Sequence, residues 1–221
     1  MKPSTLVALP DPMTLRRRAQ TLGVLDAIMS PDWQYRYYSF NSKWAQDEMM
    51  ASMTDGCGDN FFILFNPHGA ILKGFDHENV MSPWARDDGS LWPGMFKGVP
   101  SQFDEFLEEP AFDIPNTTFC SWRLHTDAVW QSGVTEFPDG DAGNDGSEDL
   151  LSIFLGGAEC YREFANEYYE KDLPLKHLER VYDHELLTEE LIKQLNPSMS
   201  LLELKEDLEE IAYPEQPHAN R

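Results

Sequence analysis

Cys57 is the side chain whose setting most resembles that of a nucleophile, because it stands between Gly56 and Gly58. Flanking glycines can expose a sulfur and turn backbone N–H groups toward a developing oxyanion. His77, one hairpin further along the chain, is the residue that would act as its base. A strand rather than a helix is expected after Cys57, so the sulfur lacks the helix N-terminus that activates many catalytic cysteines. A small hydrolase or transferase using Cys57 and His77 therefore stands as an alternative hypothesis.

A histidine and two acids stand together at Asp76-His77-Glu78, and zinc sites use such side chains. A second histidine would have to come from His68 or His125, because the chain has no HxH or HExxH spacing. In a strand, Asp76 and Glu78 share one face and His77 takes the other, which splits the cluster. We therefore expect no bound metal here.

The Asp- and Gly-rich stretch from Asp139 to Gly146 resembles a calcium loop only superficially. Counted from Asp139, position five is Gly143 and position twelve is Leu150, where calcium requires an oxygen ligand and a glutamate. The glycine-rich segments also lack the Lys-Ser/Thr that follows a phosphate-binding loop. An ordinary acidic loop and no cofactor are expected.

Acidic side chains dominate the composition, with a formal net charge of −22 over 221 residues. Such a charge argues against binding to nucleic acid or to an anionic membrane surface. No apolar run approaches the about 18 residues of a membrane span, and no signal-peptide pattern opens the chain. We expect a cytoplasmic protein, and the three widely spaced cysteines, Cys57, Cys120 and Cys160, predict reduced thiols.

The charge is concentrated between Gly98 and Tyr161, where thirteen acids face one base, Arg123. Such a surface either keeps the protein soluble or attracts a basic partner. Exposed tryptophans often anchor protein interfaces, and two lie in the Pro- and Gly-rich connection just before this region. The residues predicted to bind a partner are Trp84, Trp92, Asp104, Glu105, Glu108 and Glu109.

The most hydrophobic stretch of the chain, Phe61–Phe65, must be positioned by strand pairing. Five consecutive apolar residues between turn signals predict a strand buried on both faces. Asn66-Pro67-His68-Gly69 is strong turn chemistry, so Ala70–Phe75 should return as the second arm of a hairpin. This hairpin, spanning 61–75, is the expected centre of the sheet.

The remaining elements are read from caps and periodicity. Asp11-Pro12 predicts the start of an N-terminal helix. Alternating aromatic residues predict a strand over Trp33–Phe40, and a helix should follow through Met49 to Met53. With the hairpin and a strand over Thr117–His125, this makes an antiparallel sheet of about four strands.

Beyond the acidic loop, the pattern indicates helices only. Pro174 and Thr188 mark two helix starts, and Ser200 with Glu203 resembles a capping box. The sequence predicts one α+β domain over 1–221, with a sheet-containing part over 1–135 and an all-helical part over 145–213 packed on it.

Several stretches also resemble a group of soluble bacterial proteins of about this length that carry no established activity. They are WQYRYYSF (33–40), GFDHENVMSPW (74–84), WPGMFKGVPSQFDEFLEEPAF (92–112) and TTFCSWRL (117–124). In size, charge and class the chain also resembles bacterial immunity proteins, including the SUKH group, which neutralise toxins by binding them. The first resemblance implies no activity, whereas the second implies a protein that acts by binding, and neither transfers a functional residue. Together with the acidic charge, they favour a non-catalytic acidic protein that binds a basic protein partner.

Overall fold

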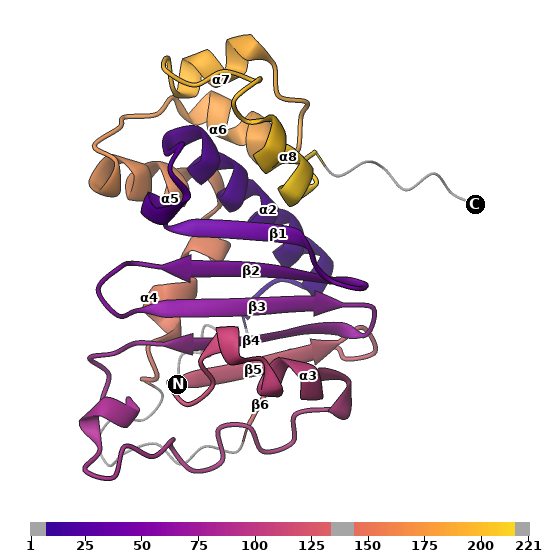
Figure 1. Ribbon diagram of the computed structural model, residues 1–221, viewed down its shortest axis with the longest axis vertical. Helices are drawn as coiled ribbons and strands as arrows, with labels where there is room; N and C mark the ends of the chain where they lie inside the picture. The colour runs from indigo at the N-terminus through magenta and orange to yellow at the C-terminus, as the bar shows by residue number, and fades with distance from the viewer. Residues whose placement is uncertain (1–7, 134–143, 215–221) are drawn as a thin grey trace.

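The computed structural model describes residues 8–133 and 144–214, and its centre is a six-stranded antiparallel sheet in which each strand pairs with the next along the chain (Figure 1). The predicted α+β class is confirmed, but the sheet has six strands, not four. The strands are Tyr38–Ala45 (β1), Glu48–Thr54 (β2), Asn60–Asn66 (β3), Gly69–Phe75 (β4), Phe119–Leu124 (β5) and Gln131–Ser132 (β6).

Seven α-helices lie within the described residues: Pro12–Met29 (α2), Asp104–Glu108 (α3), Ser147–Leu151 (α4), Ile153–Tyr168 (α5), Leu175–Tyr182 (α6), Glu189–Leu195 (α7) and Lys205–Ile211 (α8). Four 3₁₀ turns accompany them: Trp33–Tyr35 (η1), Pro83–Ala85 (η2), Ser101–Phe103 (η3) and Pro110–Phe112 (η4). The prediction that the C-terminal part is all helical is wrong. Residues 170–174 and 185–188 connect its helices without regular structure.

The predicted hairpin is confirmed as β3 and β4, which pair from Asn60–Phe75 to Asn66–Gly69. Its apolar run is covered on both faces of the sheet, as expected. Phe61, Ile63 and Phe65 belong to one buried cluster, whereas Leu64, with the half-buried Phe62 beside it, belongs to another. A strand with side chains alternating between two cores needs apolar residues at every position.

Two different layers cover the sheet (Figure 1). Behind it lie α2 and α4, and the other C-terminal helices stand beyond the β1 edge; apolar side chains of these helices join the larger cluster. In front lies the connection from β4 to β5, which carries η2, η3, α3 and η4 and supplies Phe103, Phe106 and Phe112 to the smaller cluster. The sheet therefore separates the helical part of the chain from the acidic connection.

The predicted helix through Met49 to Met53 is wrong, because this segment forms β2. Met53 and Ala51 face the helices while Met50 packs on the opposite side, a period of two that a strand requires. Methionine favours helices only weakly, and pairing with both β1 and β3 overrides that preference.

The strand predicted over Trp33–Phe40 begins later than expected, at Tyr38. Its first residues form η1 instead, in a bend fixed by Arg36. The guanidinium of Arg36 donates from Nε to the Ser30 carbonyl at 2.9 Å and pairs with Asp207 of α8 at 2.5 Å. A long-range ion pair of this kind leaves no local periodic signal.

Helix α2 begins as predicted, with Asp11 accepting hydrogen bonds from the backbone N–H groups of Met13 and Thr14. Polar side chains then join α2 to the end of the chain. Gln20 donates to the carbonyl of Ile211 at 3.1 Å, and Asn196 donates to the carbonyl of Ile28 at 2.7 Å. The C-terminal helices are thus bonded to the first helix as well as packed on it.

Most of the acidic loop from Asp139 to Gly146 lies outside the described residues. All three cysteines are free thiols: Cys57 is exposed, Cys160 half-buried and Cys120 buried. Within the two described ranges, no helix is both long and apolar enough to cross a membrane.

Candidate functional site

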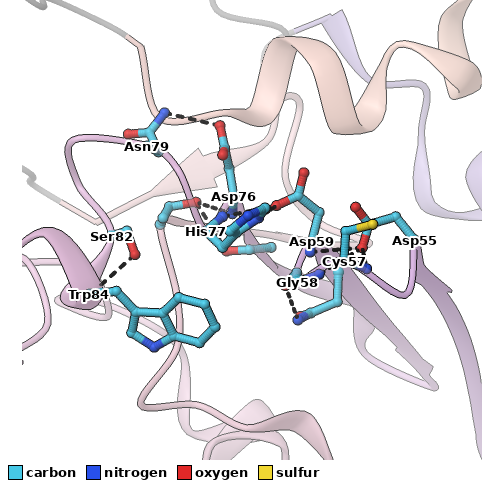
Figure 2. A network of polar contacts seen from close by, with 12 residues as sticks. Asp55, Cys57, Gly58, Asp59, Asp76, His77, Asn79, Ser82 and Trp84 are labelled. Carbon is cyan, nitrogen blue, oxygen red and sulfur yellow. Dashed lines mark hydrogen bonds and ion pairs between the residues drawn. The ribbon is translucent and has the colours of Figure 1, made fainter.

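The glycine-rich loop between β2 and β3 folds around the carboxylate of Asp55 (Figure 2). Asp55 Oδ1 accepts backbone N–H groups from Cys57 at 2.8 Å, from Gly58 at 3.0 Å and from Asp59 at 2.9 Å. These are the donors that the sequence suggested for an oxyanion. Because the loop's own carboxylate occupies them, they stabilise the turn instead.

His77 lies against this loop, but its partner is Asp59. The side-chain Nδ1 of His77 is 2.6 Å from Asp59 Oδ1, and the His77 backbone N–H donates to the same oxygen at 2.9 Å. The hydrogen bond to Asp59 is the main cause that raises the pKa of His77 above its ordinary value. The pair therefore favours an imidazolium held by a carboxylate.

Gly58 permits this contact. A Cβ atom there would lie 2.8 Å from Cγ of His77, so any other residue would push the ring away. Extending the β3–β4 register beyond the Asn60–Phe75 pair places Gly58 opposite His77. The meeting of Gly58 and His77 could have been found from the sequence, because the register of the predicted hairpin determines which residues lie opposite each other just beyond its end.

Cys57 does not join His77 in a nucleophile–base pair. Among the described residues, no hydrogen bond connects the two side chains, and Figure 2 shows Asp59 turned toward the His77 ring. Cys57 and His77 do not line the hollow beside Arg36 or the hollows beside Phe65. A catalytic cysteine needs its base within hydrogen-bond reach, so this geometry gives the enzyme hypothesis little support.

Trp84, predicted to anchor a partner, lies beside His77. It is 62% exposed, and its ring meets Phe75 edge-on with 5.0 Å between centroids. The His77 ring is 6.0 Å from the Trp84 ring, also in an edge-on arrangement. Ser82 caps this turn by accepting the Trp84 backbone N–H at 3.1 Å. A rigid, exposed indole thus stands at one end of the sheet.

Trp92 has a different environment. It is half-buried, packs against the smaller cluster and stacks with the guanidinium of Arg86, which lies 4.9 Å from its ring. A tryptophan already covered by an arginine offers less apolar surface to a partner than Trp84 does.

The predicted acids lie on α3 and just after it. Asp104, Glu105 and Glu108 are exposed, while Phe106 on the opposite side of the helix is buried. Glu109 is half-buried, and its Oε1 accepts the Ala111 backbone N–H at 2.9 Å, which caps η4. Three of the four acids therefore face solvent, and the fourth has a structural role.

Glu48, which the sequence did not single out, lies near these acids. Burial raises its pKa above the ordinary value, and the charge of Glu105 raises it further. Glu48 belongs to the start of β2, a segment predicted as helix, so sequence reasoning could not place it beside α3. The acidic surface is thus larger than predicted.

The predicted contact residues divide between opposite ends of the sheet. Trp84 packs on Phe75, which pairs with Asn60 where β3 begins. Glu105 is near Glu48, at the end where β1 turns into β2. The strands between these ends are seven residues long, or roughly 20 Å. Trp84 and the α3 acids therefore form two separate surfaces.

The acids and histidines described above do not come together as a metal site. Within the described residues, no group of three or more His, Cys, Asp or Glu side chains is placed to hold a metal ion. Among the described residues, no third His, Cys, Asp or Glu side chain is placed to complete a metal site with Asp59 and His77.

Comparison with known proteins assigns no family to this arrangement. No protein-family model, no curated protein and no solved structure matches the chain. The resemblance to immunity proteins therefore stays a prediction, and function is argued from the contacts of these residues alone.

Proposed function

We propose that this protein is a non-catalytic binding protein whose acidic surface engages a basic protein partner. The observation that carries the proposal is the outer face of α3, where Asp104, Glu105 and Glu108 are exposed. None of the three forms an ion pair with another described residue. Their negative charge is therefore available to a partner.

The acidic face stands on a rigid support. Phe103 and Phe106 are buried beneath it, and Phe106 packs on Phe112 with 4.7 Å between ring centroids. Asn66 in the β3–β4 turn also donates to the carbonyl of Gln102 at 3.1 Å, which ties this segment to the sheet. Carboxylates held in this way need little ordering on binding, which favours association.

Charge over the whole molecule supports the same function. A net charge of −22 attracts a basic protein over a distance and raises its association rate at low salt. A toxin blocked by an immunity protein is one kind of partner that fits this description. The hydrolase or transferase alternative is less well supported, because Asp55 and Asp59 occupy the groups that it would use.

The proposal is tested by neutralising the α3 face. The variant D104N/E105Q/E108Q removes three charges there, and E163Q/E167Q/E170Q removes three exposed charges on and just after α5. Glu109 is left unchanged because it caps η4. Surface changes of this kind alter the free energy of unfolding by about 0.5 kcal/mol or less each, so both variants should fold.

Partners are captured with each protein and the wild type, and the recovered basic protein is then purified for kinetic measurement. We expect the α3 variant to slow association, while the α5 variant changes it less. Raising salt from about 0.01 M to about 0.15 M should slow the wild type, since the Debye length falls from about 30 Å to about 8 Å. Equal association rates for the two variants, or a wild-type rate that salt leaves unchanged, would contradict the proposal.

A further inference from the structure

Two large aromatic side chains are exposed on η1, the 3₁₀ turn between α2 and β1. Trp33 is 67% exposed and Tyr35 is 61% exposed, whereas the sequence pattern placed both in a strand. Tryptophan and tyrosine are enriched among the residues that carry most of the binding free energy in protein interfaces. Neither side chain belongs to the surfaces described above, so η1 is a third place where a partner can make contact.

Hydrogen bonds hold the backbone of this turn in place. The N–H of Tyr35 donates to the Asp32 carbonyl at 3.1 Å, and the N–H of Arg36 donates to the Trp33 carbonyl at 3.0 Å. The Arg36 guanidinium is buried and pairs with Asp207 of α8. A turn fixed in this way needs no ordering of its backbone when a partner binds, which favours association.

Trp33 also lines a small hollow between η1, the edge of β1 and α8, which lies beside that edge (Figure 1). The hollow has a volume of about 20 Å³, and Arg36, Asp207 and Glu210 line it with Trp33. A space of about 10–15 Å³ is enough for one water-sized group. The compact ammonium of lysine is close to this size, whereas the planar guanidinium of arginine is larger. The volume therefore favours lysine.

The three charged side chains that line the hollow leave one negative charge unbalanced. Arg36 donates to both carboxylate oxygens of Asp207, at 2.5 Å and 3.1 Å, so these two charges cancel. Glu210 is exposed and forms no ion pair with any residue in the described part of the chain. A cation in the hollow therefore balances the charge of Glu210.

An anion suits this hollow poorly. A guanidinium has five N–H donors, and Arg36 already uses four of them. Besides the two bonds to Asp207, its Nε donates to the Ser30 carbonyl at 2.9 Å and its Nη2 to the Pro31 carbonyl at 3.1 Å. A second copy of this chain, with its own net charge of −22, would also be repelled. The ligand that fits is a cation from a different, basic protein.

The indole of Trp33 adds a second attraction for a cation. An ammonium within about 6 Å of an aromatic ring centre is attracted to the ring face, most strongly in tryptophan. The aliphatic stem of lysine packs well on apolar surface while its charged end stays polar. The protein already makes such a contact within itself, since the Arg86 guanidinium lies 4.9 Å from the Trp92 ring.

We propose that Trp33 and Glu210 receive a lysine side chain from a basic protein partner, with the ammonium in the hollow at Glu210 and the stem against the indole. This inference rests on the proposed function, because it requires a basic partner, and it adds to that function a point of contact outside α3. Tyr35, exposed on the same turn, gives the partner further aromatic surface.

The test is an NMR titration of isotope-labelled protein with acetyl-Gly-Lys-Gly-amide. One control peptide carries norleucine in place of lysine, which keeps the stem and removes the ammonium, and another carries arginine. We expect the lysine peptide to move the indole N–H signal of Trp33 and the amide signal of Glu210. The norleucine peptide should bind at least about fivefold more weakly, because it leaves Glu210 without a cation. The arginine peptide should also bind more weakly, because its guanidinium exceeds the hollow.

Two variants assign the effect to the hollow. W33L and E210Q should each weaken binding of the lysine peptide by about two- to fivefold, the range of an exposed cation–π contact or a surface ion pair. The matched controls W84L and E167Q remove an exposed indole and an exposed charge elsewhere, and they should leave the affinity unchanged. All four side chains are exposed, so the variants should fold.

The outcomes separate this inference from the proposed function. If the signals that move belong only to Asp104–Glu108, the proposed function is supported and the Trp33 inference is overturned. Equal binding of the norleucine peptide, tighter binding of the arginine peptide, or unchanged affinity in both W33L and E210Q also overturns it. A lysine peptide that moves no signals overturns the inference as well, whereas capture with the α3 variant still decides the proposed function.

Discussion

Asp26 is a carboxylate without access to solvent, in the last turn of α2. Its Oδ2 accepts the backbone N–H groups of Tyr37 at 2.8 Å and Tyr38 at 2.7 Å, while Tyr161 Oη donates to its Oδ1 at 2.7 Å. One side chain thus joins α2, the start of β1 and α5. Burial raises the pKa of Asp26 to about 6, although these hydrogen bonds lower it.

This raised pKa predicts a pH dependence of stability. Between the ordinary pKa of 3.8 and about 6, the folded protein keeps a proton on Asp26 that the unfolded chain loses. The contribution of Asp26 is therefore fully present below the lower value and is lost as pH rises through the higher one. A shift of two pKa units corresponds to about 3 kcal/mol.

The variant D26N should lack this dependence. We expect the free energy of unfolding, measured in urea at pH 4 and pH 7, to fall more between these values in wild type than in D26N, by about 3 kcal/mol. D172N, at a position 84% exposed, serves as the control and should follow the wild type. Parallel pH profiles for wild type and D26N would show that Asp26 does not titrate in this range.

Lys73 is a second fully buried charged residue, located on β4 facing the acidic connection. Its Nζ donates to Asn60 Oδ1 at 2.9 Å and to the Asn116 carbonyl at 2.8 Å, and it lies over the Phe62 ring at 5.2 Å. Burial lowers its pKa to about 8. The ammonium thereby fastens the front layer to the sheet.

Replacing Lys73 with methionine should destabilise the protein by about 1–3 kcal/mol, because Asn60 and Asn116 lose a buried donor. The difference from wild type should grow as pH rises from about 8 to about 10.5, since the unfolded chain keeps the lysine proton longer than the folded protein does. Urea unfolding at pH 7 and pH 9.5 measures both effects. K43M, at an exposed position of β1, is the control, and an equal loss in both variants would contradict this role.

At the scale of elements, the β3–β4 hairpin is the support on which both surfaces stand. Its first end carries the Asp55 loop and His77, and its other end carries Asn66, which donates to the Gln102 carbonyl beside α3. The buried side chains of β3 therefore hold the two ends of the hairpin, and the surfaces on them, at a fixed distance from each other.

Truncation of Ile63 tests this support. Ile63 is fully buried in the larger cluster, so I63A should lower the free energy of unfolding by about 2–5 kcal/mol through lost contacts and a residual cavity. V129A, at a position 50% exposed, should change it by about 0.5 kcal/mol or less. Urea unfolding of both variants checks the prediction, which fails if their losses are equal.

Elements with strong local signals could be predicted from the sequence. The Asn-Pro-x-Gly turn and the five apolar residues identified the hairpin, and Thr188 marked α7, whose Leu191 N–H it accepts. Ser200 and Glu203 do bond to each other as a capping box would, but α8 begins only at Lys205. The local hydrogen bonds between Ser200 and Glu203 therefore form, but they do not mark the start of α8.

Elements determined by distant partners could not be predicted. Met49–Met53 becomes a strand because β1 and β3 are on either side of it, and neither neighbour is encoded within the segment. The same distinction between local and distant partners applies to the residues of the candidate site. Gly58 and His77 meet through the predicted hairpin register, whereas Glu48 meets Glu105 only through the three-dimensional fold.

At the scale of the molecule, the sheet keeps unlike surfaces apart. Its back layer contains the bases of α2 that bond within the protein, such as Arg18, which donates to the Phe154 carbonyl. Its front layer carries α3 with exposed acids. The net charge of −22 is thus displayed unevenly on the two sides of the sheet.

Helix α2 also has a consequence for how the chain must be made. Its Gln20 bonds to a carbonyl 191 residues later, and its Ile28 carbonyl accepts from Asn196. The segment through Ile211 must therefore be synthesised before α2 has all of these polar partners. Contacts between such distant residues slow folding, so a nascent chain would expose this apolar helix until the last helices emerge.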